Sequence, residues 1–244
     1  MSAGALVVAL VAAQILAPAS PSLSEAKSEA ACSVGSWQMT WGFKESFRAY
    51  LSGAIAEGEW QTGGDVSYAT PSFIIAGSRG TVAADASSGQ LSAQGSIRFL
   101  GHSGLLDQVL SHPVLLWEGN SGVISLDVEG ATQEGVEVAT PQVEFVDLEW
   151  DSFEVNTATG VITASASEVS LRQEGAEAFG TYPEGEPFDP LKISIEVEPG
   201  CLEEVQTVPT WLIWLVVGLG AVGLGAIPLA RKWRGQARPT PAES

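Results

Sequence analysis

The sequence has few of the side chains that usually bind metals or cofactors. Its 244 residues include two histidines, two cysteines, two methionines and three tyrosines. It contains no Cys-x-x-Cys pair, zinc-type histidine spacing, serine nucleophile elbow or phosphate-binding glycine loop. These absences argue against a zinc site, phosphate-loop nucleotide binding and the common hydrolase mechanisms. Any ligand site therefore depends on a short list of residues.

Basic residues are also scarce. The chain has 11 Lys and Arg against 29 Asp and Glu, which gives a formal net charge of −18 at pH 7. Only six of the basic residues but 24 of the acidic ones lie between the two cysteines. An acidic surface repels phosphate backbones, so we expect no nucleic-acid partner.

The two ends predict a cell-surface protein. An apolar stretch at 4–16 precedes Ala17-Pro18-Ala19, which is typical of a secretory signal, and we assign 1–31 to a signal peptide and linker. Because no Lys or Arg precedes the apolar stretch, an uncleaved N-terminal anchor is the alternative. Export places the following residues outside the cell.

The C-terminal part predicts one membrane span. Residues 211–230 carry no charge and are long enough to cross a hydrocarbon core. A 202–210 linker precedes the span, and a basic tail at 231–244 follows it. Because positive flanks stay cytoplasmic, we expect a single-pass protein of the cell membrane with residues 32–201 outside and its C-terminus in the cytoplasm.

Cys32 and Cys201 bracket nearly the whole segment between the apolar stretches. In an oxidising compartment a disulfide between them is the natural expectation. Lipid attachment at Cys32 is the alternative, but such a site usually has a small-residue run directly before it with a hydrophobic core just upstream, and this combination is missing. The size of the bracketed segment suits one domain with its own core.

Alternating apolar residues predict a mainly β, antiparallel β-sandwich or barrel-like ectodomain. Turn signals such as Ser88-Gly89 and Thr159-Gly160 separate the alternating runs. These runs are Leu91/Ala93/Ile97/Phe99, Ile124/Leu126/Val128, Val146/Leu148/Trp150, Val161/Thr163/Ser165 and Ile193/Ile195/Val197.

Two short α-helices are expected beside the strands. Apolar residues recur at helical spacing over 41–55, with Thr40 as N-cap, and Tyr50 shares the face of Phe43 and Phe47. The second helix is predicted over 104–111, with Leu105 and Leu106 inward.

The second predicted helix stops before Pro113, because a proline disfavours helix at the residue before it. His102 would then lie at a strand-to-helix turn.

Tyr50 and His102 are the most informative candidate site residues. A phenolate oxygen is a hard donor that suits ferric iron, and an imidazole can donate a hydrogen bond to that oxygen. Ser46 lies one helical turn before Tyr50. From the residues alone, core packing of the tyrosine and a backbone-bonded histidine are the simpler alternative.

Three motifs resemble a known family. They are Trp41-Gly-Phe-Lys-Glu-Ser-Phe-Arg-Ala-Tyr50, Phe99-Leu-Gly-His-Ser-Gly104, and Phe179-Gly-Thr-Tyr182 with Phe188-Asp-Pro-Leu191. In content and order they are similar to the HtaA-domain family of bacterial surface haem-binding proteins. The likeness covers roughly residues 37–198.

The resemblance implies a site for ferric haem b. Tyr50 would be the axial ligand of the iron and His102 its hydrogen-bond partner. Ser46 and Tyr182 would contact the propionates. Phe43 and Phe47 would line the porphyrin face, with ordinary core packing as the alternative for both.

The resemblance also implies a function without catalysis. We expect a membrane-anchored extracellular protein that captures haem from haem-donor proteins and relays it to an importer or to neighbouring haem-binding surface proteins. The alternative from another class is a structural or adhesive β-sandwich domain without a cofactor.

Overall fold

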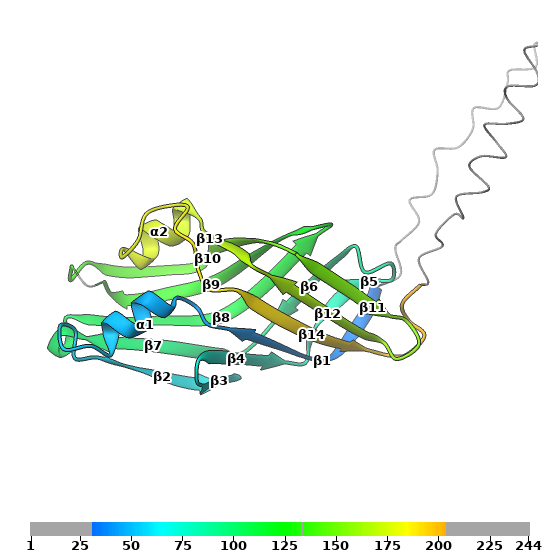
Figure 1. Ribbon diagram of the computed structural model, residues 1–244, viewed down its shortest axis with the longest axis horizontal. Helices are drawn as coiled ribbons and strands as arrows, with labels where there is room; N and C mark the ends of the chain where they lie inside the picture. Colours follow the sequence, from blue (N-terminus) through cyan, green and yellow to red (C-terminus); the bar gives the residue numbers. More distant parts are fainter. Residues whose placement is uncertain (1–30, 133, 204–244) are drawn as a thin grey trace, which may run out of the picture. The chain divides into compact units, whose positions relative to one another are not determined.

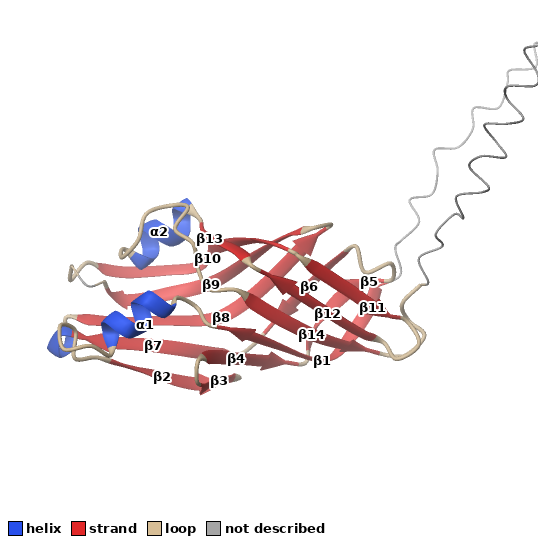
Figure 2. Cartoon of the chain, viewed as in Figure 1, coloured by secondary structure: helices blue, strands red, loops and turns tan. Residues whose placement is uncertain are grey.

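The computed structural model describes residues 31–132 and 134–203, and these fold mainly into antiparallel strands (Figures 1 and 2). In chain order the elements are β1 Ala31–Trp41, α1 Glu45–Leu51, β2 Glu59–Gly64, β3 Val66–Ala69, β4 Ser72–Gly77, β5 Arg79–Ala83, β6 Ser88–Ser92, β7 Gly95–Gly101, the 3-10 turn η1 His102–Gly104, β8 Leu106–Glu118, β9 Ser121–Ala131, β10 Glu137–Glu149, β11 Ser152–Asn156, β12 Val161–Ala166, β13 Glu168–Leu171, α2 Gln173–Phe179 and β14 Leu191–Val197.

The strands form one curled antiparallel sheet that folds into two facing layers. One layer runs β3-β4-β1-β14-β12-β11, and the other contains β2-β7-β8-β9-β10-β13. Strand β1 joins them, because its first residues pair with β5 and its later residues pair with β4 and β14. The mainly β prediction is therefore confirmed.

The core lies between the two layers. Phe73 on β4 and Phe99 on β7 pack edge-to-face with ring centroids 6.2 Å apart, and Trp117 on β8 meets Phe153 on β11 at 6.4 Å. Inward-facing residues of β9 and β14 alternate as the sequence predicted, including Ile124, Leu126, Val128, Ile193, Ile195 and Val197. This packing fixes the layers as a sandwich.

Strand β12 corrects one detail of the predicted pattern. The strand exists, but its buried residues are Ile162, Ala164 and Ala166 rather than the alternate set Val161, Thr163 and Ser165. Both sets alternate, so the spacing alone did not decide which one faces the core.

The predicted helix over 104–111 is wrong. His102–Gly104 form only a 3-10 turn, and strand β8 begins at Leu106. Leu106 and Leu110 are buried while Leu105 is 65% exposed, which is a period-two pattern. Pairing with β7 and β9 on both edges outweighs the local helical spacing.

The first helix is shorter than predicted. It covers Glu45–Leu51, because Trp41 still belongs to β1 and Phe43 has a positive φ of 65°. The N-cap is Lys44 rather than Thr40, and it makes no side-chain capping bond. A positive φ at a non-glycine residue is incompatible with continuing a helix through Phe43.

Helix α2, Gln173–Phe179, was not predicted from the sequence. It ends at Gly180, whose φ of 65° gives a left-handed C-terminal cap. Gly175 faces β10 so closely that a Cβ there would collide with the carbonyl of Phe145. Both helices lie toward the end of the sheets opposite the start of β1 (Figure 1).

The terminal predictions lie outside the described residues. These are the signal peptide, the membrane span at 211–230 and the basic tail. Among residues 31–132 and 134–203, no helix has the length and apolar character needed to cross a membrane.

The predicted disulfide between Cys32 and Cys201 is confirmed. Cys32 lies on β1 and Cys201 follows β14, with their Cα atoms 5.7 Å apart and a separation of 169 positions in the sequence. The bond therefore closes nearly the entire described chain into one loop.

Replacing both cysteines by serine is expected to lower the free energy of unfolding by about 4–5 kcal/mol, because the unfolded chain regains the entropy of a long open loop. Urea unfolding of the double variant and the parent measures this. An equal unfolding midpoint for the two proteins would contradict the loop argument.

Candidate functional site

Helix α1 presents a mixed surface at one end of the sandwich. Phe47, Arg48 and Leu51 are buried, whereas Ser46 is exposed and Tyr50 is half-buried. Tyr50 packs against the core, as predicted for the face that it shares with Phe47, but it is only half-buried and lies at the rim of that face. Ser46 and Tyr50 are four residues apart, so they share one side of the helix.

The Tyr50 hydroxyl meets His102 at 2.5 Å from its Nε2 atom. The two ring centroids are 5.8 Å apart. Both side chains are half-buried, and His102 lies in the η1 turn directly after β7, so the predicted turn is present although a strand and not a helix follows it. Residues 52 apart in sequence thus form one phenol–imidazole pair.

The η1 turn brings His102 to this position. His102 and Ser103 have positive φ values of 53° and 55°, and Gly104 follows with 93°. The His102 N–H donates to the Ala56 carbonyl at 2.7 Å, which ties the turn to the segment after α1. Three left-handed residues in succession reverse the chain tightly, so that the imidazole faces the helix.

An exposed ion pair joins the strands on either side of this turn. Arg98 on β7 donates from Nε and Nη2 to the two carboxylate oxygens of Asp107 on β8, at 2.7 and 2.6 Å. The hydrogen bond from Arg98 holds the pKa of Asp107 below its usual range. Two parallel bonds favour one register of β7 and β8, the strands on either side of the turn that contains His102.

The phenol–imidazole pair has clear chemical capabilities. A phenol oxygen that shares one hydrogen bond with an imidazole keeps a further lone pair for another partner. If the imidazole donates, it favours the ionised oxygen, which is the form that binds ferric iron. The pair therefore suits a ligand molecule that contains a hard metal ion such as ferric iron.

Phe43 and Phe47 are core residues. Both are fully buried, so neither presents a face to a ligand at the surface. Phe43 contacts seven other aromatic rings with centroids 5.0–6.5 Å away. These rings belong to Trp41, Phe47, Phe73, Phe99, Phe145, Phe179 and Phe188. The structure thus favours the core alternative for both phenylalanines.

Tyr182 lies beside α1, against Phe47 and Lys44. Its half-buried ring stacks on Phe179 at 6.3 Å and meets Phe47 edge-on at the same centroid distance. The Lys44 Nζ atom lies 5.0 Å above the ring centroid. Tyr182 is therefore connected to the helix that carries Tyr50 through Phe47 and Lys44.

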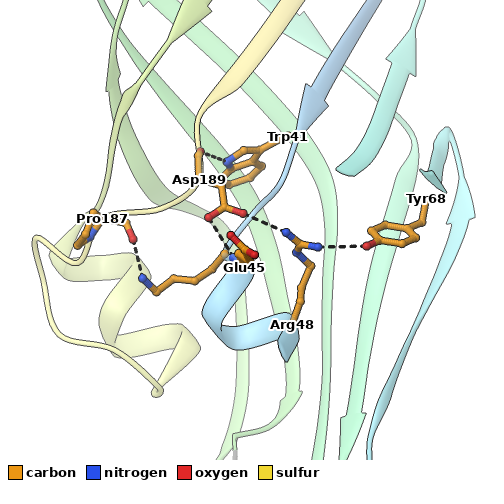
Figure 3. A network of polar contacts seen from close by, with 7 residues as sticks. Trp41, Glu45, Arg48, Tyr68, Pro187 and Asp189 are labelled. Atoms are coloured by element: carbon orange, nitrogen blue, oxygen red, sulfur yellow. Dashed lines mark hydrogen bonds and ion pairs between the residues drawn. The ribbon is translucent and has the colours of Figure 1, made fainter. Parts of the chain in front are cut away.

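Two basic residues of this region, Lys44 and Arg48, bind acidic residues near β14, and Figure 3 shows the pair between Arg48 and Asp189. Arg48 Nη2 lies 3.2 Å from Asp189 Oδ2, and Lys44 Nζ lies 2.7 Å from Glu186 Oε1. The sequence had singled out the Phe188-Asp189-Pro190-Leu191 motif without assigning a role to its carboxylate. No spacing rule connects residues 141 positions apart, so this contact was missed.

Exposed apolar residues flank the pair. Ile55 is 77% exposed and Leu105 is 65% exposed, although Leu105 had been predicted to face inward. Ile55 precedes Ala56, which accepts the bond from His102, and Leu105 donates its N–H to the His102 carbonyl at 3.3 Å. Apolar side chains exposed next to a polar pair are typical of a ligand-contacting rim.

Comparisons with known proteins agree with this architecture. The HtaA family model matches residues 36–194, which is more than half of the chain, so the chain belongs to the HtaA-domain family. This confirms the resemblance seen in the three sequence motifs. A search of curated proteins returned no significant match.

Solved structures with the same fold come from Corynebacterium glutamicum. The C-terminal domain of its HtaA is 30% identical, covering 68% of this chain and 99% of that one, with a TM-score of 0.63. The N-terminal domain of HtaA is 26% identical with the same coverages and a TM-score of 0.57. The heme-binding protein HtaB, at 19% identity, covers 69% of this chain and 95% of its own, with a TM-score of 0.52.

Phe47→Ala is expected to lower the free energy of unfolding by about 3–5 kcal/mol, because it leaves a cavity between the two layers. The neighbouring Ser46→Ala is the matched control and should change it by less than about 0.5 kcal/mol, since Ser46 is exposed. Urea unfolding measures both. A small loss for Phe47→Ala would show that its ring is not part of the core.

Proposed function

We propose that this chain is a haem-binding protein in which Tyr50 is the axial ligand of ferric haem b and His102 hydrogen-bonds the ligating oxygen. The 2.5 Å contact between the Tyr50 hydroxyl and His102 Nε2 is the observation that carries this proposal. Membership of the HtaA-domain family supports it, as does the likeness in fold to a protein described as heme-binding.

The exposure of the pair fits this role. A ligand as large as a porphyrin needs the phenol oxygen to be reachable, and Tyr50 is only half-buried. The hard oxygen donor suits ferric iron, and the His102 ring supplies the hydrogen bond that orients and stabilises it. The fully buried ring of Phe47 attaches the helix to the core, and Phe43, just before the helix, packs in the same core.

Ser46 and Tyr182 are the proposed partners of the propionates. Ser46 is exposed one turn before Tyr50, on the same side of α1. The Tyr182 ring packs on Phe47, so it lies on the α2 side of the same helix. Hydroxyl groups donate to carboxylates, which is the chemistry that this assignment requires.

The biological task in this proposal is transfer and not catalysis. The protein would be anchored in the cell membrane by 211–230, with its haem site outside the cell. It would take haem from donor proteins and pass it to an importer or to neighbouring haem-binding surface proteins. A single anionic side-chain ligand suits this task, because protonation of the Tyr50 oxygen weakens its hold on ferric iron and allows release.

Adding haemin to the purified protein should produce a Soret band with the charge-transfer features of a phenolate–iron bond. Tyr50→Phe removes only the ligating oxygen and should abolish most of this spectrum. His102→Ala should shift and weaken it, because the oxygen loses its hydrogen-bond donor. Absorption titrations measure both effects.

His112→Ala is the matched control for His102→Ala. The two histidines have nearly equal positive φ values, 51° and 53°, but His112 pairs with Asp127 on β9. The His112 variant should keep the parent spectrum. If Tyr50→Phe also kept it, the ligand assignment would be wrong, and an absence of any haemin spectrum would favour the adhesive domain without a cofactor.

Ile55→Ser and Leu105→Ser together should weaken haemin binding by roughly tenfold or more, because covering exposed apolar side chains with a porphyrin is favourable. Stability should change little, since both residues are already exposed. Val136→Ser is the control, because Val136 is 55% exposed in the segment just before β10. If the parent protein, the double variant and Val136→Ser bound haemin with equal affinity, Ile55 and Leu105 would have no role in haem binding.

A further inference from the structure

Helix α1 is attached to the segment before β14 by two ion pairs. Lys44 and Arg48 are one helical turn apart, and their partners Glu186 and Asp189 are three residues apart on that segment. Lys44 Nζ also donates to the Pro187 carbonyl at 2.7 Å. We call these four charged residues the clamp.

The Asp189 carboxylate also caps the helix. Its Oδ1 accepts the backbone N–H of Glu45 at 3.0 Å, and its Oδ2 accepts from Arg48 Nη2 at 3.2 Å (Figure 3). The N-cap residue Lys44 supplies no side-chain acceptor. A carboxylate at a helix N-terminus satisfies a free N–H and complements the helix dipole, so a residue from far along the chain performs this task.

The main chain of Asp189 is fixed as well. Its N–H donates to the Phe43 carbonyl at 2.8 Å, and its carbonyl accepts from Trp41 Nε1 at 2.9 Å. A Cβ at Gly42 would collide with the Asp189 carboxylate. The residues immediately before α1 therefore determine the position of the Asp189 carboxylate.

The two cations of the clamp are buried, whereas its carboxylates are 29% and 25% exposed. The side chains of Lys44 and Arg48 are only 10% and 9% exposed. The Tyr68 hydroxyl accepts a further bond from Arg48 Nη1 at 3.1 Å (Figure 3). A buried cation without its carboxylate is an uncompensated charge. Separating Lys44 or Arg48 from its carboxylate is therefore energetically unfavourable.

The clamp connects two residues of the proposed haem site. Tyr50 follows Arg48 by two residues on α1, and Tyr182 precedes Glu186 by four residues. Lys44 Nζ lies over the Tyr182 ring as well as against Glu186. The same network therefore holds the helix that carries one tyrosine and the segment that carries the other.

We propose that Lys44, Arg48, Glu186 and Asp189 are positioning residues that set the separation and orientation of Tyr50 relative to Tyr182. This inference rests on the proposed function, in which both tyrosines contact one haem. A ligand held at its iron and at its propionates requires both contacts to be placed within about 0.5 Å. Helix α1 has seven residues, too few to hold its own geometry without such contacts.

The competing assignment is that Lys44 and Arg48 bind the propionates directly. Both cations already have carboxylate partners and are almost fully buried. A propionate would have to displace Glu186 or Asp189 to reach them. The two assignments predict opposite effects of removing a carboxylate, because a freed cation would bind haem more tightly.

The test compares haemin-loaded variants of the whole 244-residue chain in mild detergent. Asp189→Ala removes the cap and the ion pair, whereas Asp189→Asn keeps one acceptor oxygen. We expect haem transfer to apomyoglobin to become roughly fivefold faster for Asp189→Ala and less so for Asp189→Asn. The phenolate–iron charge-transfer band should shift in the same order.

Asp151→Asn is the matched control. Asp151 also accepts a backbone N–H, from Ser167 at 2.5 Å, but at the junction of β10 and β11. This variant loses a carboxylate of similar local function and should keep the parent band and transfer rate. A purely structural role of Asp189 would instead change the unfolding midpoint while leaving the band unchanged.

Gly42→Ala tests the same position without removing a charge. Its new Cβ should push the Asp189 carboxylate away from α1 and move the band in the same direction as Asp189→Asn. If Asp189→Ala does not fold, this variant and Asp189→Asn decide the question. Parent-like bands and transfer rates in both would overturn the proposal, and so would tighter haem retention.

A measurement without haem separates this proposal from the proposed function. In the unloaded protein the imidazole NMR signals of His102 should shift in Asp189→Asn and Gly42→Ala, because Tyr50 moves, and should not shift in Asp151→Asn. Unchanged signals would refute the clamp. A parent protein that takes up no haemin would refute the haem function and leave this readout valid.

Discussion

The packing of Phe43 between the two sheet layers is the constraint on which the site depends. Phe43 follows β1 and has a positive φ. Its ring packs among aromatic residues from β4, β7, β10, α2 and the segment before β14. Edge-to-face and stacked contacts of this kind add to the area that is buried. Since α1 begins two residues later, the position of the helix follows from this ring.

The site is assembled from elements that are distant in sequence. Tyr50 comes from a seven-residue helix, His102 from a turn 52 residues later, and Asp189 from a segment 141 residues beyond Arg48. None of these pieces is stable alone, because short isolated helices and turns are marginal in water. The Cys32–Cys201 disulfide closes the opposite end of the same domain, so the core is bounded at both ends.

Local patterns predicted the strands better than the helices. Alternation located β9 and β14 correctly, since half-buried strands have a period of two residues. The segment around Leu105 and Leu106 has helical spacing but forms a strand, because hydrogen bonding to neighbours on both sides decides its conformation. Helix α2 has little apolar periodicity and is stabilised by its contact with β10.

The sequence by itself determined the class of the protein: an acidic, mainly β domain with one disulfide pair and three motifs of the HtaA-domain family, in which Tyr50 and His102 were the informative residues. Only the tertiary structure decided that Phe43 and Phe47 belong to the core, that Tyr50 lies at the rim, and that Asp189 caps α1. Composition and periodicity report on local preference and burial. Contacts between distant residues are set by how the layers pack, which no local pattern records.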